Sequence, residues 1–395
     1  MSAQSDLWTD EYLDSMRRIG DPEADQAIAA VFAEGNQQAQ AVLGVIESLV
    51  RNSEPTPQNL PPALHGYLEK TARVPPPVLP RVKLGEYAFA EHGPEILCLL
   101  GCYSLPAAYG ARRGAQVLVR TGQLTERAHH RLMVTSQMVL DVMGPGGLAL
   151  GGRGIRTAQK VRLMHAAVRH LLLNSTRSPW DLSDLGVPIN QEDLAGTLMT
   201  FSYQIMDGLA QLGLPLQPEE QEAYLDSWKA VGHLMGVHPT LIPQTIADAK
   251  ILTDTIERRQ IAASPEGKQL AQALLEMMDH ASPRFAHGIP PAIMRRLLPE
   301  TVADFLGIPH STVHKWAVSL MVGVARGIDT FTARRKHRTI VFRFLTMHLL
   351  QWMVTLNLGR PAKFEIPLEL SEQWNVPPTR EDDGVPVPKP TAAKT

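Results

Sequence analysis

The sequence has little cysteine and no surplus of either charge. Cys98 and Cys102 are the two cysteines among 395 residues, so a framework of disulfides cannot hold the fold. Lys and Arg number 38 and Asp and Glu 40, which gives a formal net charge of −2. This balance argues against attraction to nucleic acid or to an anionic membrane. The CxxxC spacing puts both thiols on one helix face, where we expect two buried structural thiols rather than a metal site.

Segments that would span a membrane or direct export are also missing from the pattern. The longest apolar stretch, residues 344–358, is too short to cross a bilayer and contains His348 and Gln351. No apolar core of a secretory signal is visible, and polar residues follow Arg17 and Arg18 where a twin-arginine signal needs an apolar run. We therefore expect a cytoplasmic protein without a transmembrane segment. The basic run at 334–338 is expected to be a solvated loop, with peripheral membrane contact as the alternative.

Several common catalytic signatures are absent: the P-loop, the Rossmann glycine run, GxSxG and HExxH. The sequence also lacks CxxCH, so any haem would be held without covalent attachment. What the sequence has instead is helical periodicity and a group of His and Arg residues on apolar helices.

The apolar spacing predicts an all-α protein with a single large helical domain. We expect N-terminal helices over 1–54, a Pro-rich and mostly non-helical connector over 55–84, the helical domain over 85–370 and a Pro-rich, disordered tail over 371–395. The helices expected are at 24–34, 37–49, 94–105, 125–143, 156–174, 190–212, 218–235, 240–262, 266–278, 290–297, 299–306, 311–326 and 338–358.

The segment 156–174 carries the first candidate site. His165 lies on an otherwise apolar stripe, and Arg162 and Arg169 flank it at i−3 and i+4. A neutral imidazole on an apolar wall can bind haem iron, and nearby guanidinium groups could pair with haem propionates. From the pattern alone, a core histidine bonded to a backbone carbonyl is the better interpretation. The other members of the stripe are Ala158, Val161, Val168 and Leu172.

The preceding segment, 125–143, carries the second candidate. Arg131 and Thr135 share one stripe with Met138 and Val142. An arginine and a hydroxyl on an apolar face could donate hydrogen bonds to bound dioxygen. The alternative is an arginine near the helix start that reaches solvent. The glycine-rich stretch 144–154 follows a helix, which does not fit a phosphate-binding loop; it could approach a planar ligand closely or be a long flexible connection.

Residues 301–316 resemble a helix-turn-helix, with Gly307 at the turn. The continuation over 317–325 is apolar on nearly every side, so we expect it to be buried and expect no nucleic-acid partner. A helical DNA-binding regulator nevertheless stays open as an alternative function.

Five stretches together resemble one known family: VRTGQL at 119–124, RLMVT at 131–135, VRLMHAAVR at 161–169, NQEDL at 190–194 with Phe201, and WKAVGHLMG at 228–236. This chain is similar to the family of bacterial latex clearing proteins and fungal mycophenolic-acid B oxygenases. The resemblance implies a globin-like core with non-covalent haem b. It implies that His165 is the proximal ligand of the haem iron and that Arg131 and Thr135 are the distal residues.

The resemblance also implies a reaction, in which both atoms of O2 go to a carbon–carbon double bond of a hydrophobic substrate and leave two carbonyls. Two positions depart from the rubber oxygenases: Val134 stands where they have a lysine, and Ala115 is the ungapped counterpart of their pocket glutamate. With no export signal visible, we expect a dioxygenase for a smaller hydrophobic, isoprenoid molecule. A non-catalytic haem-binding sensor is the remaining alternative.

Overall fold

The computed structural model describes residues 5–33, 44, 49, 53–58, 60–74, 79–121, 128–176, 178–281 and 287–310. Within these ranges the chain forms helices and no strand, with one isolated β-bridge between Ala111 and Ile261, so the all-α prediction is confirmed. The α-helices are α1 (Asp10–Met16), α2 (Pro22–Ala33), α4 (Pro62–Lys70), α5 (Leu79–Leu99), α6 (Leu105–Gly110), α7 (Arg112–Arg120), α8 (Ala128–Met143), α9 (Gly154–Leu173), α10 (Leu182–Leu185), α11 (Gln191–Phe201), α12 (Tyr203–Gln211), α13 (Pro218–Leu234), α14 (Ile246–Gln260), α15 (Pro265–Ala281), α16 (Ile289–Leu297) and α17 (Glu300–Phe305). Short 3-10 helices lie at Ser5–Leu7 and Pro239–Leu241, and a π-helical turn spans Leu100–Ser104.

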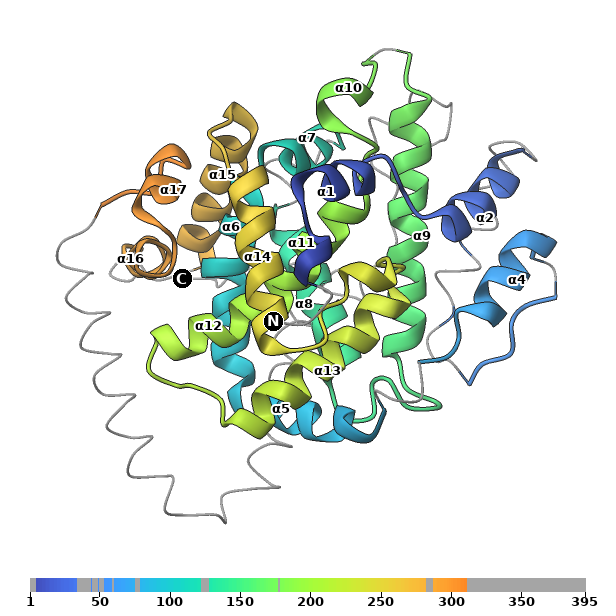
Figure 1. The fold of residues 1–395 in the computed structure, drawn as a ribbon, viewed down its shortest axis with the longest axis horizontal. Coiled ribbons are helices and arrows are strands. Elements are labelled where there is room, and N and C mark those ends of the chain that lie inside the picture. The colour runs from blue at the N-terminus through green and yellow to red at the C-terminus, as the bar shows by residue number, and fades with distance from the viewer. Residues whose placement is uncertain are drawn as a thin grey trace, which may run out of the picture.

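The pair α5 and α13 forms one side of the main core, where the two helices lie against each other (Figure 1). They approach closely at Gly85, where an added Cβ would lie 2.1 Å from Ser227 Oγ. Phe89 on α5 and Tyr224 and Trp228 on α13 are completely or almost completely buried. The glycine therefore allows a helix crossing that encloses three large aromatic side chains.

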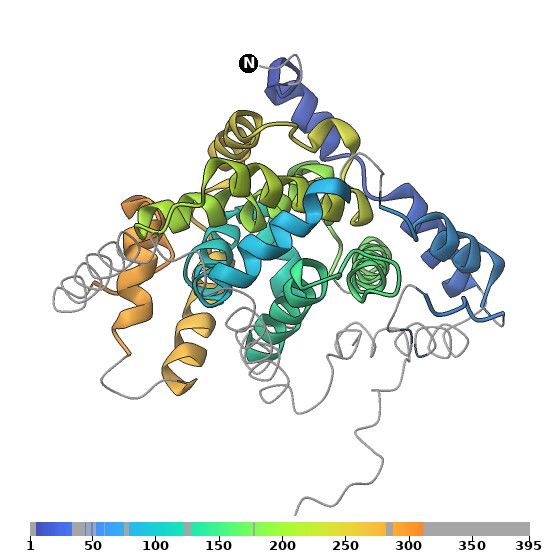
Figure 2. The ribbon, with the colours of Figure 1, turned by 90° about the horizontal axis from the view of Figure 1, so that it is seen from below.

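A smaller layer of helices covers the side of α9 that faces away from the main core. The paired helices α2 and α4 pack against α9 at one edge of the molecule, away from α15 to α17 (Figure 2). Ile28, Leu64 and Leu163 are fully buried between them. The N-terminal helices therefore form part of the α9 environment and are not a separate unit.

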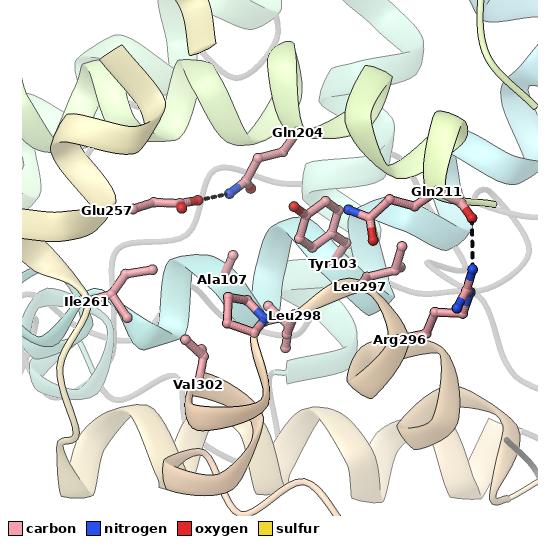
Figure 3. Close-up of a pocket in the computed structure, with 11 residues that line it drawn as sticks. Tyr103, Ala107, Gln204, Gln211, Glu257, Ile261, Arg296, Leu297, Leu298 and Val302 are labelled. Atoms are coloured by element: carbon pink, nitrogen blue, oxygen red, sulfur yellow. Dashed lines mark hydrogen bonds between the residues drawn. The ribbon is translucent and has the colours of Figure 1, made fainter. Parts of the chain in front are cut away.

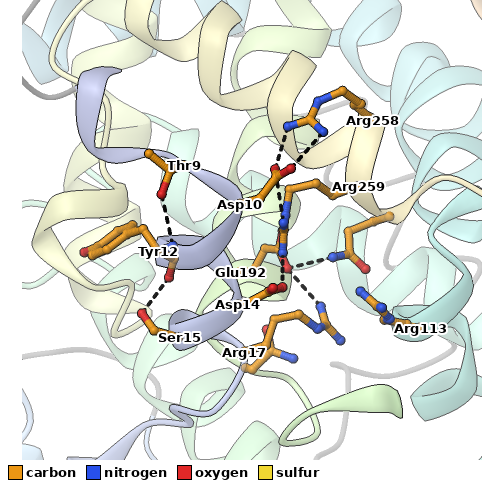
Figure 4. A network of polar contacts seen from close by, with 12 residues as sticks. Thr9, Asp10, Tyr12, Asp14, Ser15, Arg17, Arg113, Glu192, Arg258 and Arg259 are labelled. Carbon is orange, nitrogen blue, oxygen red and sulfur yellow. Dashed lines mark hydrogen bonds and ion pairs between the residues drawn. The ribbon is translucent and has the colours of Figure 1, made fainter. Parts of the chain in front are cut away.

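Ion pairs attach α1 to α11 and α14 (Figure 4). The fully buried Glu192 carboxylate on α11 pairs with Arg17 at 3.2 Å and with Arg259 at 2.6 Å. At the other end of α1, the exposed Asp10 lies 2.6 Å from Arg258. The helix α1 is thus held by its buried Leu13 and Met16 and by ion pairs that are buried at its inner end and exposed at its outer end.

The connector predicted over 55–84 is wrong where the structure has helices. The helix α4 follows Pro61 and begins with Pro62, and α5 has Pro80 as its second residue. Proline is tolerated in the first turn of a helix because the N–H it lacks would have no intrahelical partner there. Pro94 lies inside α5, where His92 departs from helical geometry with φ −109° and ψ 17°.

Two further predictions need correction. The helix expected over 190–212 is two helices, because Ser202 takes a non-helical conformation between α11 and α12. Its ends were predicted correctly: the Asn190 side chain accepts from Asp193 N, and Gly213 ends the pair with φ +82°. Of the two thiols expected to be buried, Cys102 is buried and Cys98 is exposed.

The helix-turn-helix-like segment lies only partly within the described residues. Its first helix is α17, and Gly307 has the left-handed φ of +72° that the turn requires. Val302 and Ala303 are buried, so α17 is part of the packed body. The predicted helices at 311–326 and 338–358, the basic run and the tail lie outside the described residues. No helix in the described ranges is long and apolar enough to cross a membrane.

Candidate active site

The glycine-rich stretch between α8 and α9 is a compact turn that brings these two helices together. Gly147 N donates to Gly144 O, and Gly154 N donates to Gly147 O, each at 2.9 Å. A Cβ on Gly152 would lie 2.3 Å from the carbonyl oxygens of Gly146 and Gly147, so no other residue fits there. The alternative of a long flexible connection is therefore wrong, because the turn folds back on itself. The helices that it joins pack against each other.

His165 lies on α9 in an environment that keeps its ring neutral. Burial, with a smaller effect from the positive charge of Arg169, lowers the pKa of His165 to about 4. Its Nδ1 atom is buried without a hydrogen-bond partner, whereas the residue as a whole keeps some accessible surface. That surface is therefore not at Nδ1. The interpretation as a core histidine bonded through Nδ1 finds no partner in the described part of the chain.

This arrangement suits haem iron better than a bare metal ion. Neutral imidazole is the form that binds iron, and a porphyrin supplies the equatorial ligands itself, so one protein side chain is enough. A bare ion would need several protein ligands. Among the described residues, no group of three or more His, Cys, Asp or Glu could hold one.

Arg162 is turned toward the N-terminal layer and has partners within the protein. Its Nε and Nη2 atoms donate to the two carboxylate oxygens of Asp21 at 2.5 and 2.8 Å, and Nη2 also donates to Glu23 at 3.0 Å. Arg162 is 7% exposed and Asp21 3% exposed. A bidentate, buried pair of this kind occupies the guanidinium group.

Arg169 is held in the same way. It donates to Asp25 at 2.7 Å and to the carbonyls of Pro188 and Ile189 at 3.0 Å each. Burial lowers the pKa of the Arg169 guanidinium, and the Asp25 carboxylate opposes that effect. The geometry thus gives no support to the predicted pairing of Arg162 and Arg169 with haem propionates. Both arginines fix α9 to neighbouring backbone and carboxylates.

Thr135 lies on α8, half-buried, on the same stripe as Met138 and Val142, which face the core. Met138 and Val142 on that stripe are buried at 9% and 1% exposure. Toward the C-terminal end of α8, Asp141 accepts from Thr157 Oγ1 of α9 at 2.7 Å and from Gln137 of its own helix at 2.8 Å. These contacts fix the relative positions of the helices that carry Thr135 and His165. Arg131 belongs to α8, but its side chain lies outside the described part of the structure.

No feature of the sequence predicted the acidic partners of the two arginines on α9. Asp21 and Asp25 lie 141 and 144 residues from the arginines that they hold. Both come from the start of α2, which appears as an ordinary acidic first turn in the sequence. A second polar site was also missed: a cavity of about 310 Å³ next to α12 and α14, which has none of the predicted site residues in its lining.

The helical body, with a neutral and mostly buried histidine on the helix that follows the glycine turn, places this chain among the all-α proteins. Comparison with known proteins identifies the class further. Residues 95–327, more than half of the chain, match the family described as ER-bound oxygenase mpaB/B'/rubber oxygenase, catalytic domain. This chain belongs to that family, as the resemblance in its sequence predicted. It is therefore related to oxygenases, which are oxidoreductases.

Two relatives agree with this assignment. The chain is 27% identical to a rubber oxygenase of Streptomyces sp. (strain K30) over 305 residues, which cover 75% of this chain and 72% of the relative. It also resembles a solved structure of latex clearing protein in the closed state, with a TM-score of 0.74 and 25% identity. That similarity covers 89% of this chain and 94% of the other. The matched family region contains α8, the glycine turn and α9.

Proposed function

We propose that this protein is a haem b-dependent oxygenase that cleaves a carbon–carbon double bond of an isoprenoid substrate with O2. The observation that carries the proposal is His165: a neutral, mostly buried ring whose Nδ1 has no described partner, within the region that matches an oxygenase family. His165 would hold the iron, and the haem would be bound without covalent attachment. When bound, haem supplies the redox chemistry that activates O2.

The protein's own residues position the reacting groups and exclude water. The lowered pKa of His165 keeps the ring unprotonated across the neutral range, so no proton competes with a metal for it. The buried Met138 and Val142 on the stripe of Thr135 keep this face of α8 apolar and exclude water. In this proposal the Thr135 hydroxyl and the Arg131 guanidinium donate hydrogen bonds that orient oxygen or substrate. Arg162 and Arg169 hold the helix that carries His165.

The substrate class follows from the relatives. One of them is named a rubber oxygenase, and rubber is polyisoprene, so the isoprene unit is the shared chemistry. Addition of both oxygen atoms across the C=C bond gives two carbonyl groups, with no other reactant required. Val134 and the missing acid at Ala115 support a short isoprenoid over the polymer. An assay of carbonyl products from latex and from short isoprenoids decides between these substrates.

The proposal is tested by the absorption spectrum of the purified protein. The wild type should show a Soret band, extractable as haem b, and His165→Ala should lose it. His170→Ala is a matched control on the same helix, because that ring stacks on Phe32 at 4.8 Å and 7°. Retention of an unchanged Soret band by His165→Ala would overturn the assignment. A wild type that binds no haem would favour the regulator, and haem without oxygen consumption would favour the sensor.

A further inference from the structure

A cavity separate from α8 and α9 lies between α12, α14 and the α16–α17 hairpin (Figure 3). Its volume is about 310 Å³. This is at the small end of the range for small-molecule pockets, about 300–1,000 Å³. Its walls come from segments far apart in the sequence, and neither His165 nor Thr135 contributes to them. The cavity therefore needs an explanation of its own.

One end of the cavity presents hydrogen-bond acceptors. Glu257 on α14 accepts from Gln204 Nε2 at 2.5 Å, and Figure 3 shows this contact at one end of the cavity. The Oε1 atom of Gln204 is buried and has no partner in the described part of the chain. The Tyr103 hydroxyl donates to Asp207 at 3.1 Å, so its oxygen can only accept from a ligand. A buried amide oxygen without a donor is unfavourable, and a ligand that donates to it would remove that cost.

The electrostatics of this end favour a positive charge. Glu257 forms no ion pair with any described residue, and two of the three charged groups that act on it, Asp207 and Asp254, are also acidic. Burial, with a smaller effect from those two carboxylates, raises the pKa of Glu257 above its usual range. Lys250 opposes the shift but pairs with Asp254 at 2.6 Å. The cationic side chain at the far end, Arg296, is exposed and directed to the carbonyl of Gln211 at 3.4 Å.

The rest of the lining is apolar and includes Ala107, Ile261, Leu298 and Val302. An anion in the cavity would be repelled by the Glu257 carboxylate. A neutral alcohol would supply only one donor for several acceptors. A bare divalent cation would find one carboxylate at the cavity wall, whereas such ions prefer six or more oxygen ligands. A primary ammonium group has a positive charge and three N–H donors.

We propose that this cavity binds a small organic ammonium ion. The ammonium group donates to Glu257, to Gln204 Oε1 and to the Tyr103 oxygen, and its short hydrocarbon part lies against the apolar walls. Because α16 and α17 form one wall, an occupied cavity connects this hairpin to α12 and α14. The site is independent of the proposed oxygenase function, since it shares no residue with α8 or α9.

Three probes of nearly equal shape test the proposal: cyclohexylammonium, cyclohexanol and cyclohexanecarboxylate. Binding to the full-length protein is measured at neutral pH by isothermal titration calorimetry. Cyclohexylammonium should bind at millimolar concentration or better, and the other two should bind at least about tenfold more weakly, because hydrogen bonds to a charged group are stronger than those between neutral groups. Equal binding of the ammonium and the alcohol, or no binding of the ammonium, would overturn the proposal.

Two variants locate the binding. Glu257→Gln keeps an oxygen that accepts from Gln204 but removes the charge, and should weaken ammonium binding about tenfold or more. Asp254→Asn is the matched control, because that carboxylate lies on the same helix but is 58% exposed and pairs with Lys250. It should weaken ammonium binding much less than Glu257→Gln does, because this carboxylate is not in the lining of the cavity. Unchanged affinity in Glu257→Gln would refute the site. Binding accompanied by a shift of a haem absorption band would place the amine on iron and would refute it equally.

Discussion

Replacing Arg162 by methionine separates a structural role of this arginine from a role in binding haem. Methionine keeps most of the length of the side chain and removes its charge. The change leaves Asp21, which is 3% exposed, as a buried carboxylate without its bidentate partner. Breaking a buried ion pair on one side costs about 3–5 kcal/mol, because the remaining charge stays desolvated. Glu23 adds little to this cost, since it is more exposed and also pairs with Lys70 at 2.6 Å.

We therefore expect the free energy of unfolding of Arg162→Met to fall by about 3–5 kcal/mol. Urea denaturation of the haem-free protein, followed by far-UV circular dichroism, measures this change. The double variant Arg162→Met/Asp21→Asn should recover most of the loss, because it removes the uncompensated charge. Asparagine at position 21 can still accept from Ala24 N at the start of α2, as Asp21 does at 3.3 Å.

Two outcomes would refute this reasoning. One is an unfolding free energy of Arg162→Met within about 1 kcal/mol of wild type, which is the range of an exposed pair. The other is a double variant that is less stable than the single one. If Arg162→Met kept its stability but lost haem, the arginine would have the propionate-binding role that its place beside His165 predicted.

Three further changes test other parts of the structure. Thr135→Val should lower oxygen consumption with an isoprenoid about tenfold or more, while Thr135→Ser, which keeps the hydroxyl, should stay near wild type; equal rates would show that the hydroxyl is structural. Glu257→Gln should raise the free energy of unfolding at neutral pH and leave it unchanged below the usual pKa of glutamate. A raised pKa means that the stability provided by the protonated carboxyl is lost as pH rises, and glutamine avoids that loss. Urea denaturation at several pH values measures the difference in unfolding free energy. A variant that is less stable than wild type at neutral pH would contradict the prediction. Gly85→Ala should cost about 1–3 kcal/mol in thermal or urea unfolding because its Cβ would collide with Ser227. Gly66→Ala, at a helical site with nothing within 4 Å, should be neutral or stabilising, and equal effects at the two glycines would contradict the close crossing.

The sequence predicted well what depends on local pattern. The helix expected over 156–174 is α9 at Gly154–Leu173, and the helix expected from residue 190 begins at an N-cap on Asn190. Both features depend on residues that are close together in the sequence. Prolines misled the prediction over 55–84, since their effect depends on whether they fall in the first turn of a helix or inside it.

The site was predictable in part, for a similar reason. The apolar stripe that contains His165 and the stripe below Thr135 follow from helical spacing. The roles of Arg162 and Arg169 do not, because their partners come from a different helix at the start of the chain. No motif in the sequence indicated the cavity that we propose to bind an ammonium ion. Its polar groups, at Tyr103, Gln204 and Glu257, come together only when α12 and α14 pack beside the turn that follows α5.

The ion pairs of α1, which are buried at one end of the helix and exposed at the other, have a consequence for how the chain responds to salt. Salt screens the exposed pair of Asp10 and Arg258, but much less the pair of Arg17 with the buried Glu192. Trp8, Leu13 and Met16 are buried in the core, so α1 should keep its place at high ionic strength and lose only the contribution of the exposed pair. The buried ion pair and these apolar side chains, and not the exposed pair, therefore fix the start of the folded body.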